Sequence, residues 1–139
     1  MKTVALILAG GIGKRMGASL PKQFLEIKGK PVLVHTLSNF QRNDSVNSIV
    51  VVCVSDWIEY TWDLVKKYNL SKVEAIIPGG DTSHDSTRNG IFHLRRTLGK
   101  GDVVIIHDAA RPILPQKAID EMLRIAKDSG NASFRVTRP

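Results

Sequence analysis

The chain has 139 residues, of which 42% are hydrophobic and 24% are charged, and this size and composition favour one domain around a single core. Its formal net charge of +7 indicates an acidic partner such as a nucleotide, or simply a well-solvated surface. The chain has no run of five basic residues, and its aromatic residues are not interleaved with Lys and Arg, so we expect no nucleic-acid partner. No apolar segment approaches the roughly 18 residues of a membrane span, so we expect no membrane partner.

The cysteine content and the N-terminus predict a cytoplasmic protein. Cys53, the single cysteine, lies in an apolar run at residues 49–54, which favours a buried strand residue over a nucleophile. The apolar segment after Met1 ends at Gly10 and has no cleavage site of the kind that follows a signal peptide.

Strand and helix patterns alternate along the chain. Short apolar runs rich in Val and Ile, typical of central parallel strands, lie at residues 3–8, 48–54, 73–77 and 102–106. Helical periodicity occurs at residues 31–40, from 55 or 56 to 68, at 85–98 and at 116–127. This alternation predicts an α/β fold, with a mostly parallel sheet and helices on both faces, in one domain over residues 1–139.

The predicted helices carry local signals as well. Pro31 suits an early helical position, because its missing N–H group is not needed there. Ser55 or Asp56 is a suitable N-cap for the second helix, and the pair Asp85-Ser86 for the third. In the third helix Ile91, together with Leu94 and Leu98, has the spacing of a core-facing stripe.

A glycine-rich, cationic loop follows the first predicted strand. Residues 8–17 read Leu-Ala-Gly-Gly-Ile-Gly-Lys-Arg-Met-Gly, and Pro21-Lys22-Gln23 follows. Glycines let backbone amides approach phosphate oxygens, and Lys and Arg supply the countercharge. The loop is neither a Walker A motif, because Arg15 follows Gly13-Lys14, nor a dinucleotide motif, because Met16 stands where a glycine is needed. The alternative is a flexible turn with solvated cations.

Three predicted strands run into unusual loops. The first leads into residues 9–17, the third into residues 78–81, and the fourth into residues 107–112, which read His-Asp-Ala-Ala-Arg-Pro. Ligands of open α/β sheets bind beyond the carboxyl ends of the strands. We therefore expect the three loops to open on one edge and to form one site.

Together these motifs resemble a known family. The residues that carry the resemblance are those of the first loop, Pro21 to Phe24, Gly29 to Leu33, Gly79 to Asp81, Asp85-Ser86, Asn89-Gly90 and the segment 107–112. They look like the cytidylyltransferases that act on 2-C-methyl-D-erythritol 4-phosphate or ribitol 5-phosphate. The resemblance runs from about residue 3 to about residue 130 and implies a Rossmann-like, glycosyltransferase-A-like sheet.

The resemblance implies an activity and a set of site residues. Such enzymes transfer CMP from CTP to the polyol phosphate with release of pyrophosphate, and they use Mg²⁺. Arg15 and Lys22 match the family's catalytic cations, and Asp108 matches its metal ligand. The positions that match nucleotide contacts are Ala9, Gly10, Gly11, Gly13, Lys14, Gly80, Asp81, Ser86, Ala109 and Arg111. The local alternatives are a turn-forming role for Asp108 and a helix cap for Asp85-Ser86.

The chain departs from the family pattern at two places. Ser83 stands where the isoprenoid-type enzymes usually carry Arg. Members of the family also continue beyond Pro139, with a second metal-binding Asp, the acceptor-binding residues and an arm that makes the homodimer. We therefore expect a shortened chain that lacks the dimer arm and binds CTP with poor catalysis, or a nucleotide-binding remnant without turnover. His84 and His107 lack zinc-ligand spacing.

The acceptor is the last open point. Methylerythritol phosphate is the commoner assignment for these motifs, and it is our main expectation. The segments 57–61 and 66–69 look more like the ribitol phosphate branch, which is the alternative.

Overall fold

The computed structural model describes residues 1–9 and 20–130, and its centre is a four-stranded sheet. The strands are β1 (Thr3–Ala9), β4 (Ser48–Cys53), β5 (Val73–Pro78) and β6 (Val103–Asp108). They pair in the order β5-β4-β1-β6, and every pair is parallel. The predicted parallel α/β sheet is therefore confirmed, and each predicted strand lies within two residues of its observed bounds.

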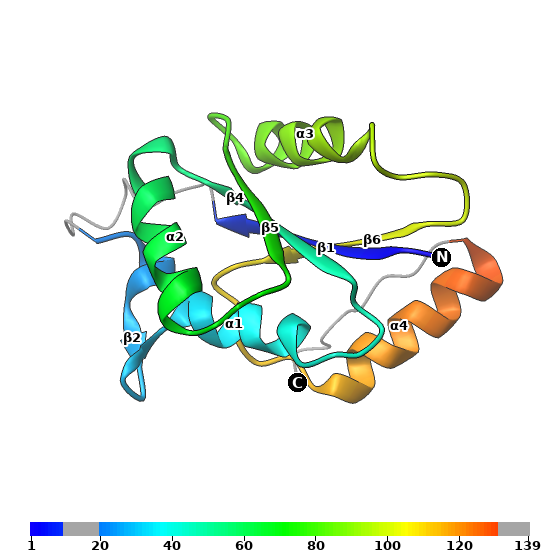
Figure 1. Ribbon diagram of the computed structural model, residues 1–139, viewed down its shortest axis with the longest axis horizontal. Coiled ribbons are helices and arrows are strands. Elements are labelled where there is room, and N and C mark those ends of the chain that lie inside the picture. Colours follow the sequence, from blue (N-terminus) through cyan, green and yellow to red (C-terminus); the bar gives the residue numbers. More distant parts are fainter. Residues whose placement is uncertain (10–19, 131–139) are drawn as a thin grey trace, which may run out of the picture.

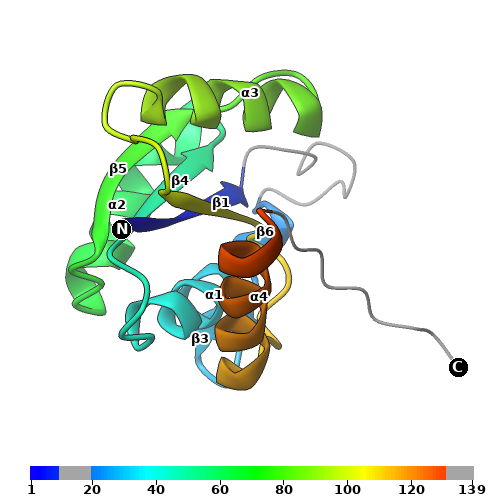
Figure 2. The ribbon, with the colours of Figure 1, turned by 90° about the vertical axis from the view of Figure 1, so that its right-hand side faces the viewer.

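Helices cover both faces of this sheet, as expected. They are α1 (Val32–Gln41), α2 (Ile58–Lys67), α3 (Ser83–Leu94) and α4 (Gln116–Ser129). Figure 1 and Figure 2 show α3 alone on one side of the sheet and α1 with α4 on the other. Residues of α2 share the hydrophobic cluster of α1 and α4, so α2 belongs to the same layer.

The side chains of β1 divide the core into two clusters. Ala5, Ile7 and Ala9 face the larger cluster with α1, α2 and α4, whereas Val4 and Leu6 face the smaller one with α3. Successive strand residues point to opposite faces, so a run that is apolar on both faces is what a sheet covered on both sides requires. Cys53 is fully buried in the larger cluster, as predicted.

The starts of two helices differ from the prediction. α3 begins at Ser83, and its N-cap is Thr82, whose Oγ1 accepts a hydrogen bond of 3.1 Å from the Asp85 amide. The cap expected at Asp85-Ser86 is therefore wrong, because these residues lie inside the first turns. Ser55 and Asp56 do not cap α2 either, since they form the short 3-10 helix η3 (Ser55–Trp57) that precedes it.

The expected core stripe of the third helix is also only partly right. Leu94 is buried and Leu98 packs against the smaller cluster, but Ile91 is 42% exposed. α3 ends at Leu94 rather than at Leu98, so the spacing that relied on a longer helix does not hold over its whole length.

The segment between β1 and α1 contains elements that the sequence patterns did not predict. It holds the 3-10 helix η2 (Lys22–Phe24) and a small hairpin of β2 (Glu26–Ile27) and β3 (Lys30–Pro31). The hairpin turn places Lys28 at φ 52° and Gly29 at φ 78°. Two successive positive φ angles are typical of a type I′ turn, for which a Gly at the second position is favourable.

The strand order defines where a ligand is expected. The chain builds outward from β1 through β4 to β5 and then returns to the other side of β1 with β6. This change of direction makes a crevice at the carboxyl ends of β1 and β6, the usual binding place in open α/β sheets. In Figure 1 the arrowhead of β1 marks that edge.

Candidate active site

The end of β1 is the meeting point of two predicted site segments. The Gln23 side-chain Nε2 donates a hydrogen bond of 2.7 Å to the Ala9 carbonyl oxygen, and Ala9 is buried. On the other side, Asp108 lies opposite Leu8 in the β1–β6 register, and the Ala109 amide donates to the Leu8 carbonyl at 3.0 Å. The segments that carry Lys22 and Asp108 are therefore attached to two consecutive residues of one strand.

The third predicted segment is attached to the neighbouring strand. Cys53 is the register partner of Ala9, and its carbonyl accepts a hydrogen bond of 2.9 Å from the Gly79 amide. The structure thus brings the loops at residues 78–81 and 107–112 to one sheet edge, as predicted, and the segment of Lys22 joins them there. The first loop, beyond Ala9, lies outside the described residues.

Part of the first loop lies outside the described residues. The positions concerned are Gly10, Gly11, Gly13, Lys14 and Arg15. Their expected roles, a backbone cradle for phosphate and a catalytic cation, stay predictions from the sequence.

Lys22 is exposed on a short, well-anchored turn. The Phe24 amide donates to the Pro21 carbonyl at 3.0 Å, and the Leu25 amide donates to the Lys22 carbonyl at 3.2 Å. Pro21, Gln23 and Phe24 are buried, whereas Lys22 projects from between them. Within residues 1–9 and 20–130 the Lys22 ammonium has no ion-pair partner, so its charge is available to an anionic ligand.

Ser86 fixes the turn that carries Gly80. Its Oγ accepts a hydrogen bond of 3.1 Å from the Gly80 amide, and its side chain is only 2% exposed. A Cβ at Gly80 would collide with the Cβ of Asp85, so the turn packs against α3 as closely as a glycine allows. Ser86 is therefore a residue that shapes this turn, in addition to any contact with a ligand.

Two acidic residues near this turn differ in their availability. Asp85 forms an ion pair of 2.9 Å with Arg88, and the hydrogen bonds from Arg88 and Thr82 hold the pKa of its carboxyl below the usual value. Asp81 is exposed, and no ion pair or side-chain hydrogen bond engages it in the described part of the chain. Of the two, Asp81 is the carboxylate that is open to a ligand, and its contact with a nucleotide stays a prediction from the sequence.

Asp108 ends β6 and forms the first turn beyond it. Its Oδ1 accepts a hydrogen bond of 2.9 Å from the Ala110 amide, so the turn-forming alternative describes a real contact. Its Oδ2 has no protein partner among the described residues, and the residue is exposed. A carboxylate with one fixed and one open oxygen fits a hard cation such as Mg²⁺.

The described residues do not form a complete protein cage for a metal. No group of three or more His, Cys, Asp or Glu side chains in residues 1–9 and 20–130 is arranged to hold an ion. Mg²⁺ is commonly held by one or two carboxylates together with substrate phosphates and water. Asp108 suits this second kind of site.

Ala109 and Arg111 continue the segment in different ways. Ala109 is 1% exposed, and its carbonyl accepts a hydrogen bond of 2.7 Å from the Thr36 hydroxyl. The Arg111 carbonyl lies 2.9 Å from the His107 Nε2, which places the ring proton on that nitrogen, and the Arg111 side chain is exposed. Ala109 thus holds the segment in place, while the Arg111 guanidinium is available for a phosphate.

Sequence reasoning missed two residues that organise this edge. Gln23 lies in the Pro21-Lys22-Gln23 motif, but no role was predicted for it. No role was predicted for Thr36 either. Both are buried polar side chains, and both donate to backbone carbonyls of site segments. Thr36 occupies the apolar face of α1, so a polar residue inside a hydrophobic stripe was the available signal.

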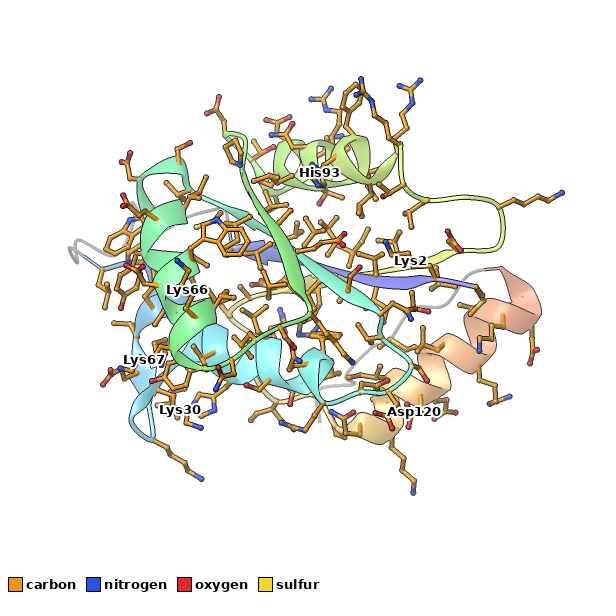
Figure 3. All side chains as sticks on the ribbon, viewed as in Figure 1. Lys2, Lys30, Lys66, Lys67, His93 and Asp120 are labelled. Atoms are coloured by element: carbon orange, nitrogen blue, oxygen red, sulfur yellow. The ribbon has the colours of Figure 1, made fainter. Side chains whose placement is uncertain are left out.

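Other features of the surface lie apart from this edge. A cavity of about 450 Å³ lies between the end of α1 and α4, where Asn43 donates to Gln116 and Asp120. Its lining includes Asp44 and Ser45, which lie in the loop before β4, so it is toward the edge opposite the predicted site. Figure 3 shows Lys30, Lys66 and Lys67 together, where the Lys30 and Lys67 ammonium groups lie 5.8 and 5.4 Å from the centre of the Tyr68 ring. Part of the positive charge is therefore ordinary solvated surface.

The sheet order and the three converging segments define a doubly wound, Rossmann-like α/β protein with its site at the β1–β6 switch point. Comparison with known proteins identifies the family to which the chain belongs. Residues 3–137 match the IspD family, described as 2-C-methyl-D-erythritol 4-phosphate cytidylyltransferase, and the chain belongs to this family.

The similar proteins are named for two different acceptors, ribitol 5-phosphate and 2-C-methyl-D-erythritol 4-phosphate. The chain is 41% identical over 133 residues to a ribitol-5-phosphate cytidylyltransferase of Streptococcus agalactiae serotype V, covering 95% of this chain and 55% of that protein. It is 43% identical over 135 residues to a 2-C-methyl-D-erythritol 4-phosphate cytidylyltransferase of Clostridium botulinum strain Langeland, covering 97% and 58%. The chain thus spans little more than half the length of these relatives.

A solved structure is similar as well. A crystal structure of 4-diphosphocytidyl-2C-methyl-D-erythritol synthase superimposes with a TM-score of 0.77 at 30% identity, over 93% of this chain and 56% of that one. The resemblance inferred from the motifs is confirmed at the level of the family. In the described residues, no helix is long and apolar enough to cross a membrane.

Proposed function

We propose that the chain is the CTP-binding part of a cytidylyltransferase that transfers CMP from CTP to 2-C-methyl-D-erythritol 4-phosphate and releases pyrophosphate. Membership of the IspD family supports this reaction. The observation that carries it is the attachment of the Lys22, Gly80 and Asp108 segments to the adjacent ends of β1 and β4.

The reaction is a displacement at the α-phosphorus of CTP. A phosphate oxygen of the acceptor forms a new bond to that phosphorus, the bond to the bridging oxygen breaks, and pyrophosphate leaves with its electron pair. Such a reaction depends on positioning and on neutralising the charge that spreads over the phosphoryl oxygens.

Lys22 has the place and the freedom for that task. It is exposed beside the end of β1 on a turn whose neighbouring side chains, Gln23 and Phe24, are buried, so the base of the Lys22 side chain is fixed there. As a compact point charge it would follow the α-phosphate through the transition state. Arg15 is proposed as the second catalytic cation on the basis of the sequence motif alone.

Asp108 is proposed as the residue that holds Mg²⁺, through the oxygen that the Ala110 amide leaves open. When bound, the ion would neutralise triphosphate oxygens and orient them. The exposed Arg111 side chain would contribute further positive charge toward the same phosphates.

The turn at Gly80, Asp81 and Ser86 is proposed as the cytosine subsite. Its backbone is fixed by the Ser86 hydrogen bond and by the packing of Gly80 against α3. A rigid backbone edge of this kind reads the polar groups of a base with little loss of conformational entropy on binding. Ala9 and the neighbouring glycines would form the opposite wall.

Ribitol 5-phosphate is the second candidate acceptor. Four relatives at 41–42% identity are named ribitol-5-phosphate cytidylyltransferase, and this supports a CDP-ribitol product as the alternative. A cytoplasmic location, where CTP is available, completes the proposal, and the homodimer is not proposed for this chain because we expect it to lack the dimer arm.

The test is pyrophosphate release from CTP and Mg²⁺ with each polyol phosphate in turn. The main proposal expects release with methylerythritol phosphate in excess of that with ribitol phosphate, and the reverse preference would favour the second candidate. CTP binding without release under either condition would leave only the nucleotide-binding half of the proposal, and no binding of CTP would contradict it altogether.

A further inference from the structure

An aromatic cluster joins the turn that carries Lys22 to the start of α2. We infer that Trp57 and Tyr60 are positioning residues for Lys22 and act through Phe24, an inference that rests on the proposed function of Lys22.

The three rings form a closed set of contacts. The Phe24 ring stacks on the Trp57 ring with centroids 5.1 Å apart and an interplanar angle of 30°, and it meets the Tyr60 ring edge-on at 5.1 Å and 88°. Trp57 and Tyr60 also meet edge-on, at 5.4 Å and 82°. Stacked and edge-to-face pairs at these distances are the favourable arrangements for aromatic rings.

Phe24 links this cluster to the candidate catalytic cation. It is 1% exposed and ends η2, the short helix that begins with Lys22. Its amide donates to Pro21, so the backbone around Lys22 bends as one rigid turn. A displacement of the Phe24 ring would therefore move the base of the Lys22 side chain.

The other end of the cluster is attached to the sheet. The Trp57 amide donates to the Val54 carbonyl at 2.9 Å, and the Trp57 carbonyl accepts a hydrogen bond of 2.7 Å from the Thr61 hydroxyl. The Thr61 hydroxyl also lies 3.5 Å from the buried Sγ of Cys53, the last residue of β4. Trp57 is thus fixed relative to the strand whose carbonyl holds Gly79.

Two attachments to the sheet therefore help to set the position of Lys22. Gln23 ties its turn to the end of β1, and the aromatic cluster ties the same turn to the end of β4. The Val32 amide of α1 also donates to the Leu25 carbonyl at 2.8 Å, so the aromatic cluster sets the orientation of the turn together with these backbone and side-chain contacts. A misplacement of about 1 Å at a catalytic group lowers turnover by as much as a hundredfold.

The test compares Trp57→Leu with Trp57→Phe and with Trp62→Leu. Trp62 lies in the same helix and packs against the main core cluster, but it has no ring contact with Phe24. Trp62→Leu is therefore the matched control for the loss of an indole from α2. Two quantities are measured for each chain: pyrophosphate release, and the hydrogen exchange of the amides of Phe24 and Leu25.

Trp57→Leu is expected to lower kcat by about tenfold or more with a smaller change in the KM for CTP, and to speed the exchange of both amides. Trp57→Phe keeps a ring against Phe24 and should restore both quantities, and Trp62→Leu should leave both near their original values. Equal effects of Trp57→Leu and Trp62→Leu on both quantities would overturn the inference.

The inference and the proposed function fail in different ways. If the unaltered chain releases no pyrophosphate, the proposed function of the chain fails, and amide exchange alone decides whether the cluster holds the turn. If the unaltered chain turns over and Trp57→Leu matches it in both quantities, the cluster does not position Lys22.

Discussion

The Thr36 hydroxyl in the middle of α1 donates a hydrogen bond of 2.7 Å to the Ala109 carbonyl, 73 residues further along the chain. Both residues are fully or almost fully buried, and Ala109 follows directly on Asp108. A helix on one face of the sheet thereby holds the proposed metal-binding segment at the end of β6.

Thr36→Val removes the hydroxyl and leaves the Ala109 carbonyl buried without this donor. We expect a loss of about 1–3 kcal/mol in the free energy of unfolding and a weaker dependence of CTP binding on Mg²⁺. Urea denaturation and CTP titrations with and without Mg²⁺ measure the two effects. Thr36→Ser keeps the hydroxyl and serves as the control, and an equal loss of Mg²⁺ dependence in both variants would contradict the role assigned to the hydrogen bond.

Ser86→Ala deprives the Gly80 amide of its buried acceptor and loosens the proposed cytosine subsite. We expect CTP affinity to fall by about fivefold to tenfold, which corresponds to the loss of one hydrogen bond of about 1 kcal/mol. Isothermal titration measures this change. Thr87→Ala is the matched control, because its hydroxyl donates to the Ser83 carbonyl within the same helix, and its CTP affinity should be unchanged.

Gly90→Ala tests how closely α3 packs on the sheet. A Cβ at Gly90 would lie 2.6 Å and 2.7 Å from the two Cδ atoms of Leu6 in β1, closer than real contacts allow. We expect a loss of about 1–3 kcal/mol in the free energy of unfolding, because the helix or Leu6 must shift. Gly99→Ala should cost much less, since its nearest neighbour would be Asp102 Oδ2 at 4.0 Å, and urea denaturation of both variants gives the comparison.

The Asp102 carboxylate is expected to stabilise the fold at neutral pH and to lose this effect in acid. The hydrogen bonds from the Gly99 amide, and next from the Lys2 amide, hold the pKa of the Asp102 carboxyl below its ordinary value of 3.8. A carboxyl whose pKa is lowered in the folded state stabilises the fold at pH values above its ordinary pKa. This contribution is lost as the pH falls through the folded-state pKa. Asp102→Asn should therefore lower Tm by a few degrees at about pH 6, with a smaller difference in strong acid.

Thermal unfolding over a pH series measures this difference. Asp63→Asn, at an exposed carboxylate with no hydrogen bond or ion pair in the described part of the chain, is the control and should change Tm little at any pH. A Tm difference for Asp102→Asn that stays constant from neutral to strongly acidic pH would show that the carboxylate charge makes no contribution.

The sheet was predictable because its strands have one simple signal. Residues such as Leu6 and Val51 belong to runs that are apolar on both faces, and this pattern is typical of a parallel sheet covered by helices on both sides. The convergence of the loops at residues 78–81 and 107–112 followed from the same geometry, since parallel strands end at one edge.

Details that depend on tertiary contacts were not predictable in the same way. The cap of α3 lies at Thr82, whose Oγ1 accepts a hydrogen bond from the Asp85 amide, whereas the sequence pattern predicted Asp85-Ser86. The roles of Gln23 and Thr36 depend on which carbonyl groups lie within reach after folding. Ile91 fits a helical stripe, yet it is exposed because the smaller cluster receives Leu94 of α3 instead.

The most direct test of the central claim is the affinity of the chain for CTP and for ATP, measured by titration at moderate salt with and without Mg²⁺. The account predicts that CTP binds more tightly than ATP, that Mg²⁺ strengthens CTP binding, and that Asp108→Asn removes most of this strengthening. A CTP affinity no greater than that for ATP, and unaffected by Mg²⁺ or by Asp108→Asn, would contradict a cytidine triphosphate site at the ends of β1 and β6.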